Sequence, residues 1–159
     1  MPRKRAWVQY VEQKYRTVLP CREVNLCVGA LAATQPEIER IKYDLVRYEA
    51  FRIDRPILAC RAGRGPCYVI DGHTRVRVLA DTGRTAVAAL LYTADDAGLQ
   101  AELRAMAVEA GGGRPRPVVD VPIVDRLGGP GSKAWEERRR ELLAKWRRED
   151  RARHESDGA

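Results

Sequence analysis

A polar segment of five residues, Asp71 to Arg75, combines residue types that can bind phosphate and move a proton. An apolar strand is expected just before it, at residues 68–70, and a helix just after it that ends at Gly83. A helix that begins at such a turn presents unpaired backbone amides and the positive end of its dipole to an anion. Arg75 adds a forked cation, and His73 adds a hydrogen-bond donor or a proton carrier. The segment therefore predicts an anion site between a strand and a helix.

Each residue of this segment suits phosphate chemistry in its own way. Gly72 allows a tight turn that brings the amides of His73, Thr74 and Arg75 toward phosphate oxygens. Asp71 could bind Mg²⁺ through water, orient His73, or simply accept hydrogen bonds from the amides of the turn. The last of these roles is purely structural and is common for aspartate in tight turns.

The same segment resembles the signature of the ParB/sulfiredoxin superfamily, in which a G-x-x-R segment lies at the phosphates of a nucleotide. The resemblance covers about residues 20–95. It implies an α+β fold, a small mixed sheet with flanking helices, to which this chain adds a basic C-terminal helix. The segments that resemble the first strand, first helix, second strand and closing strand of the family are residues 23–26, 34–48, 55–59 and 85–92.

Within the superfamily, the D-G-H-x-R order of Asp71 to Arg75 is most similar to archaeal free serine kinases, and Arg55 before Pro56 matches their cation before a proline. The resemblance implies a phosphotransferase that moves a phosphoryl group from ATP or ADP to a small hydroxyl acceptor such as serine, with Mg²⁺. The kinases have a glutamate as general base before the first helix, where this chain has Gln35. Glu37 is the alternative base, and its competing role is the acid of a helix-capping box.

The kinase interpretation assigns a role to each candidate residue. The catalytic residues are Glu37, Asp71 and His73, and Asp71 is also the expected Mg²⁺ ligand. The residues expected to bind the nucleotide and its phosphates are Gly72, His73, Thr74, Arg75, Arg55 and Gln35.

Several other chemistries are disfavoured. Sulfiredoxins have their reactive cysteine where this chain has His73, which argues against sulfinic acid reduction. Partition ParB proteins have two arginines in the motif, of which this chain keeps only Arg75, and the sequence after residue 92 is too short and too broken by glycine and proline for a helix-turn-helix domain. Residues 63–66 lack the Gly-Lys-Ser/Thr ending of a Walker loop. With two histidines in the whole chain, a histidine metal cluster is not expected.

The composition bounds the setting of the chain. A formal charge of +7 and a pI of about 9.5 favour anionic partners without separating nucleotide, nucleic acid and membrane surface. The longest apolar run, residues 86–92, is too short to span a membrane, and no signal peptide is apparent, so a cytoplasmic protein is expected. Arginine outnumbers lysine and asparagine is rare, as in some thermophile proteins, although GC-rich coding gives the same bias.

Four cysteines lack the close spacing of common zinc sites. Cys60 and Cys67 flank a turn and could form a disulfide across a hairpin if the source is a hyperthermophile. Free buried thiols are the alternative.

Three regions are expected: an N-terminal arm (1–19), a ParB/sulfiredoxin-like nucleotide-binding domain (20–127), and a basic C-terminal helix and tail (128–159). In the arm, residues 7–15 fit either a strand or a short helix. A helix over 34–48 is predicted from a capping box at Thr34 to Glu37 and an apolar face. A further helix is expected at 95–110 and a short edge strand at 118–124.

The last helix begins at Ser132, a residue suited to cap it, and places Trp135, Leu142 and Trp146 on one stripe. This stripe is expected to dock on the domain or on a second copy in a homodimer. Between residues 133 and 153 there are nine basic and five acidic residues, which fits a solvated, ion-paired helix. The alternative function is a ParB-like nucleotide switch that contacts DNA through the basic start of the chain and through Arg138, Arg139, Lys145 and Arg147.

Overall fold

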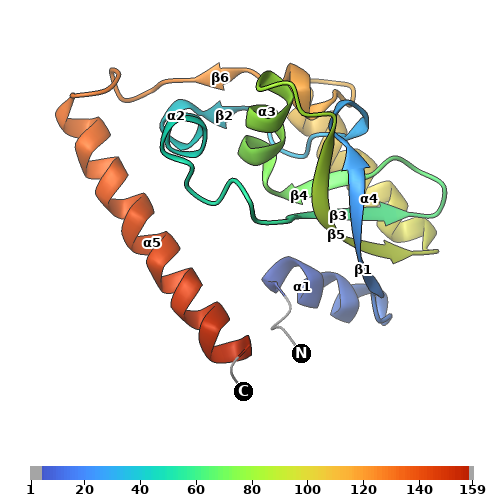
Figure 1. Cartoon of the computed structure of the whole chain (residues 1–159). Coiled ribbons are helices and arrows are strands. Elements are labelled where there is room, and N and C mark those ends of the chain that lie inside the picture. Colours follow the sequence, from blue (N-terminus) through green and yellow to red (C-terminus); the bar gives the residue numbers. More distant parts are fainter. Residues whose placement is uncertain (1–4, 158–159) are drawn as a thin grey trace.

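The computed structural model of this chain describes residues 5–157, and their side chains as far as residue 153. Its centre is a four-stranded sheet in the order β1 (Cys21–Cys27), β5 (Ala86–Ala94), β3 (Ile57–Ala62) and β4 (Tyr68–Asp71) (Figure 1). β5 pairs with β3 in parallel, and the two outer pairs, β1 with β5 and β3 with β4, are antiparallel. The expected α+β class, a small mixed sheet with flanking helices and a C-terminal helix, is confirmed.

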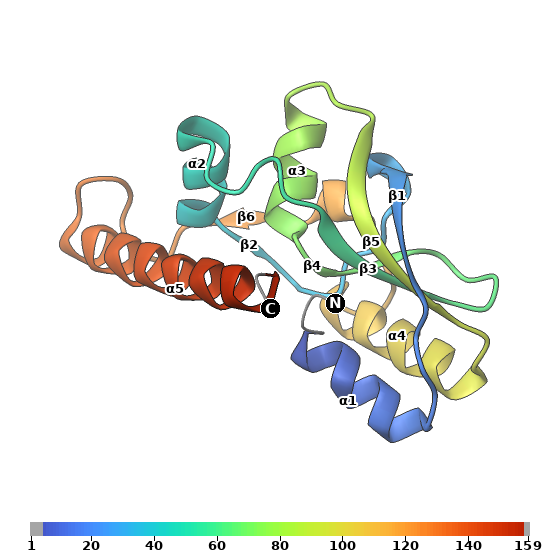
Figure 2. The same cartoon turned by 60° about the horizontal axis from the view of Figure 1, so that its bottom comes forward.

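The sheet is covered on both faces because its strands alternate apolar side chains. On one face, Ile57 and Val69 pack in a cluster with residues of α2 (Arg40–Glu49) and α3 (His73–Asp81). On the other face, Leu58 and Tyr68 pack in a cluster with residues of α1 (Ala6–Tyr15) and α4 (Ala97–Ala110) (Figure 2). The neighbours Ile57 and Leu58 thus belong to opposite faces, and the strand that leads to the Asp71 turn is held from both sides.

The N-terminal region contributes to this core. Residues 6–15, where the sequence allowed a strand or a helix, form α1. Val8 and Val11 of α1 are fully buried and pack with Leu99 and Leu103 of α4. The helix expected at 95–110 is therefore present, and it carries α1 on its surface.

The helix expected over residues 34–48 begins later than predicted, and this is a correction: α2 starts at Arg40. Thr34 does not cap a helix, because its hydroxyl donates to the carbonyl of Val69 (2.6 Å). Ile38 instead lies in a short strand, β2 (Ile38–Glu39), and Tyr48 is 70% exposed rather than part of the apolar face.

The strand expected over residues 118–124 is also shorter than predicted. Residues 118–120 form a 3-10 turn, η2 (Val118–Asp120), as do residues 28–30 in η1 (Val28–Ala30). Only β6 (Ile123–Val124) is a strand, and it pairs in parallel with β2. The amide of Ile38 donates to the carbonyl of Pro122 (2.8 Å). Residues at the start of the predicted helix therefore pair with a distant segment of the chain and do not form a helical turn.

The last helix, α5 (Lys133–Asp157), runs along the outside of α2 and ends near the start of α1 (Figures 1 and 2). The hydroxyl of Ser132 accepts a hydrogen bond from the amide of Trp135, as expected of a cap. Trp135 and Leu142 are buried in a cluster with Ile41 and Leu45 of α2. The predicted stripe therefore docks on the protein's own domain.

The hairpin between β3 and β4 is present and its cysteines are not joined, so of the two alternatives the structure has free thiols: all four cysteines are free. The strand partner of Cys60 is Tyr68 rather than Cys67. Burial raises the pKa of the Cys60 thiol to about 12, so this thiol is an inert part of the core. Within residues 5–157, no helix has the length and apolar character that a bilayer crossing requires.

Candidate anion-binding site at the start of α3

The turn between β4 and α3 can be built only with glycine at its centre. Gly72 has a φ of 115°, in the left-handed region, and a Cβ added there would lie 2.5 Å from Cγ2 of Ile57. Gly72 stands at the N-cap of α3 and supplies no side-chain cap. The amides of the first turn, including that of half-buried Thr74, thus meet no capping side chain at the N-cap.

His73 is a buried structural residue. It is 2% exposed, and its Nε2 accepts a hydrogen bond from the backbone amide of Thr34 (2.9 Å). Because Nε2 is the acceptor, the proton of the neutral ring is on Nδ1, which has no hydrogen-bond partner among the described residues. Burial lowers the pKa of His73 to about 4, with the nearby charge of Asp71 acting in the opposite direction. The ring is therefore neutral at pH 7 and is not accessible as a proton carrier.

Arg75 is buried as well, with 9% of its surface exposed. Its Nη1 donates to the carbonyls of Pro56 (2.9 Å) and Arg55 (3.2 Å), so the guanidinium holds the segment before β3 against α3. Burial lowers the pKa of Arg75, Asp71 opposes this shift, and the positive charges of Arg52, Arg5 and Arg55 lower the pKa further. Three further cations thus surround the start of α3.

Asp71 is half exposed and lies between two of these cations. Its Oδ2 is 3.5 Å from Nη2 of Arg5 and 3.8 Å from Nη2 of Arg75. Within residues 5–157, no group of three or more His, Cys, Asp or Glu side chains is placed to hold a metal ion. A single carboxylate already facing two guanidiniums is a poor Mg²⁺ ligand, so the expected metal role does not fit this arrangement.

Arg55, which was predicted to bind phosphate, forms an ion pair with a carboxylate of the same chain. Its Nη1 lies 2.6 Å from Oδ1 of Asp150 near the end of α5. Arg52, three residues earlier, contacts both Asp150 (3.2 Å) and Glu149 (2.8 Å). Two arginines beside the predicted site are thus occupied by carboxylates from the C-terminal helix.

Lys42 is a further cation that the sequence did not point to. It lies on α2, and burial lowers its pKa, with Arg138 and Lys145 adding to the shift and Glu39 and Asp71 opposing it. The printed partner of Lys42 is Glu39, whose Oε2 lies 3.9 Å from its Nζ. No local pattern marks Arg52, because its charge acts on Arg75 only after the chain has folded.

The proposed base Glu37 is engaged elsewhere. Its two carboxylate oxygens accept hydrogen bonds from Nε (3.0 Å) and Nη2 (2.7 Å) of Arg126. This pairing lowers the pKa of Glu37, which weakens it as a base. Gln35, the residue at the kinase base position, donates its side-chain amide to the carbonyl of Glu37 (2.9 Å).

The four basic residues proposed to contact DNA fall into two groups. Arg138 forms a bidentate pair with Glu39 (2.7 and 3.0 Å), and Arg139 forms one with Glu49 (2.6 and 2.8 Å), so both hold α5 to α2. Lys145 and Arg147 are exposed.

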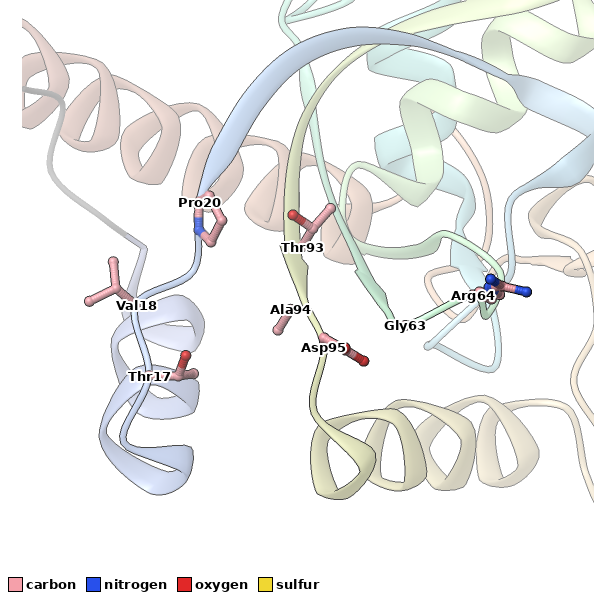
Figure 3. Close-up of a pocket in the computed structure, with 8 residues that line it drawn as sticks. All are labelled: Thr17, Val18, Pro20, Gly63, Arg64, Thr93, Ala94 and Asp95. Carbon is pink, nitrogen blue, oxygen red and sulfur yellow. The ribbon is translucent and has the colours of Figure 1, made fainter.

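An open pocket of about 540 Å³ lies elsewhere, at the other end of β3 (Figure 3). It is bordered by the segment from Thr17 to Pro20 on one side and by Gly63 and residues 93–95 on the other. Its lining carries no buried charged group, and it is separated from Gly72 by the length of the strand, so it contributes nothing to the anion site.

No protein-family model and no curated protein matches this sequence. Solved structures with some similarity include protein Atu1540 from Agrobacterium tumefaciens, 18% identical with a TM-score of 0.47, covering 67% of this chain and 63% of that one. Another is a Pnob8-like ParB-N domain, 16% identical with a TM-score of 0.37, covering 80% of this chain and 49% of that one. The chain thus spans less than two thirds of either structure's length, and no residue role is carried over from them.

Asp71, Gly72 and Arg75 therefore lie together as predicted, whereas Glu37 does not join them. Gly72 and Arg75 meet at the start of α3, next to the backbone of Arg55. Glu37 is turned toward Arg126 by a contact 89 residues away in sequence. The site that results is a group of cations around an uncapped helix start, in which the carboxylate of Asp71 faces Arg5 and Arg75.

Proposed function

We propose that this chain binds the phosphate groups of a nucleotide at the start of α3, and that it acts by binding rather than by phosphoryl transfer. The observation that carries the proposal is the first turn of α3 after Gly72, which has no side-chain cap and lies in the field of Arg5, Arg52 and Arg55. Helix-end amides and arginines together form an anion site of the type used for phosphate. That the anion is a nucleotide is suggested by the resemblance of Asp71 to Arg75 to the ParB/sulfiredoxin motif.

Phosphoryl transfer from ATP or ADP to an acceptor such as serine receives less support. It needs a base near the acceptor, and the pKa of Glu37 is lowered by Arg126. It also benefits from a metal ligand, and Asp71 faces two guanidiniums. His73 is too buried to exchange protons with a substrate. These contacts favour a binding protein over a kinase similar to the free serine kinases.

DNA contact through α5 receives no specific support either. Arg138 is paired with Glu39 of β2 and Arg139 with Glu49 of α2, so contact with DNA phosphates through them would first break those pairs.

Replacing Thr74 by aspartate is expected to weaken phosphate binding without harming the fold. A carboxylate in the first turn of α3 interacts favourably with the helix dipole, so the midpoint of thermal unfolding should stay the same or rise. The same charge repels a phosphate, and we expect the affinity for ATP, ADP and tripolyphosphate to fall about tenfold or more. Isothermal titration calorimetry with the full chain at low salt measures the affinity of the wild-type and variant proteins for each of these ligands.

Thr74→Asn is the matched control, because it changes size in the same way without adding charge. Its affinity for tripolyphosphate is expected to stay within about twofold of wild type. Adenosine, which has no phosphate, should bind neither protein. Equal binding of tripolyphosphate by the aspartate and asparagine variants would place the anion somewhere else and would refute the proposed site.

A further inference from the structure

The end of α5 places two carboxylates on two arginines whose charges also act on Arg75 at the anion site. Asp150 and Glu149, called here the C-terminal acid pair, lie 2.6–3.2 Å from the guanidiniums of Arg55 and Arg52. The side chains of these arginines are 24% and 17% exposed and those of the acids 36% and 35%, so the contacts are half-buried. The arginines lower the pKa of Asp150, which keeps its carboxylate charged.

Arg52 is held in this position by a strained local structure. Its φ is 60°, a conformation that costs free energy for a residue with a side chain. Its guanidinium lies over the ring of Trp146 at 5.3 Å, and Trp146 also contacts Phe51. Contacts with the end of α5 therefore help to maintain a backbone conformation that Arg52 would not otherwise prefer.

The same arginines belong to the electrostatics of the α3 start. The backbone carbonyl of Arg55 accepts a hydrogen bond from Arg75, and the charges of Arg52 and Arg55 both lower the pKa of Arg75. A phosphate group bound at Gly72 would be attracted to these two guanidiniums. It would then compete with the C-terminal acid pair for the same partners.

We infer that Arg52 and Arg55 form an anion subsite that the C-terminal acid pair occupies when no ligand is bound. This inference rests on the proposed function, because the competing anion is the phosphate chain of the nucleotide. Binding of that chain displaces Glu149 and Asp150 and releases the last turns of α5 from the loop before β3. Nucleotide binding at the start of α3 thereby releases the C-terminal end of α5.

The other half of α5 is anchored independently. Trp135 and Leu142 are buried against α2, and Arg138 is paired with Glu39. Displacement of the acid pair therefore frees the helix after Trp146 and leaves the part up to Trp146 docked.

The test is a double variant, E149Q/D150N, which removes the two charges and keeps the side-chain shapes. Its affinity for tripolyphosphate and for ATP is expected to be about three- to tenfold higher than that of wild type, because the ligand no longer competes with an internal anion. The matched control is E136Q/E137Q, which makes the same change in net charge at exposed positions in the first turns of α5. This control should bind within about twofold of wild type.

Hydrogen exchange provides a second measurement on the wild-type protein. Tripolyphosphate should speed exchange of the amides from Glu149 to Arg153 and leave those from Trp135 to Leu142 unchanged. If tripolyphosphate binds wild type and E149Q/D150N equally and exchange does not change, the subsite inference is wrong while the proposed function stands. If neither protein binds tripolyphosphate or ATP, both are wrong.

Discussion

Replacing Gly72 by alanine is expected to lower the free energy of unfolding by about 3–5 kcal/mol, as the sum of two costs. The first is the φ of 115°, which an L residue adopts only with strain. The second is steric, since the new Cβ would lie 2.5 Å from Cγ2 and 2.9 Å from Cβ of Ile57. Ile57 is fully buried in the sheet and has no room to move away. Urea denaturation of the wild-type and variant proteins measures the difference.

Gly83 provides a matched control at the other end of the same helix. Its φ is also positive, at 86°, but a Cβ there would meet no atom within 4 Å. Gly83→Ala should therefore pay only the backbone cost, about 1–2 kcal/mol. In a background with Ile57→Ala, part of the steric cost at Gly72 should disappear, and the two substitutions should be non-additive by about 1 kcal/mol or more. Equal losses in the free energy of unfolding for the Gly72 and Gly83 variants would show that the close approach to Ile57 costs no free energy.

The strand, turn and helix over residues 68–83 could be predicted from the sequence because their signals are local. The apolar residues before Asp71 form β4, and α3 follows Gly72 and ends next to Gly83, as the spacing of apolar residues and glycines indicates. The strands expected at residues 23–26 and 85–92 from the family resemblance are also present, and they form the antiparallel pair β1 and β5.

The start of α2 could not be predicted in the same way, because a tertiary contact competes with a local one. Thr34 and Glu37 have the spacing of a capping box, and in an isolated peptide each could satisfy the other's amide. In the folded chain the hydroxyl of Thr34 donates to Val69, and its amide donates to His73, 39 residues away. The first turn of the predicted helix is thus used to hold the β4–α3 turn in place.

The ion pairs of the site could not be predicted from the sequence because they too join residues that are far apart along the chain. Charge type can be read from a sequence, but the partner of a charge can be far along the chain. Arg126 reaches Glu37 over 89 residues, and Arg138 reaches Glu39 over 99. The sequence therefore identifies Glu37 as a candidate base and Arg138 as a candidate DNA contact, while the fold uses both in ion pairs.

The position of α5 links these observations. Its apolar stripe and its cap were readable from sequence, and both are present. The ion pairs between its acids and the arginines before β3 depend on how the whole helix docks. No local sequence pattern encodes that position. Asp150 and Arg55 are thus the part of the site that only the structure could bring together.

The stability of the wild-type protein is expected to fall by about 2–3 kcal/mol between pH 7 and pH 4.5 because of His73 alone. Burial lowers the pKa of His73 from 6.5 to about 4, so in this range the unfolded chain takes up a proton that the folded chain does not. The contribution of His73 to the free energy of unfolding is therefore fully present above pH 6.5 and is lost as the pH falls toward 4. Urea denaturation at a series of pH values measures the loss.

His73→Gln separates this effect from those of all other titrating groups, because glutamine can still accept a hydrogen bond from Thr34 but cannot be protonated. The difference between the wild-type and variant curves should be flat above pH 7 and should change steadily below pH 6.5. Carboxylates such as Asp150, whose pKa is lowered by arginines, contribute to both proteins and only at lower pH. Parallel curves would mean that His73 is protonated in the folded chain at its ordinary pKa. In that case the ring would be accessible, and its role as a catalytic proton carrier at the start of α3 would regain support.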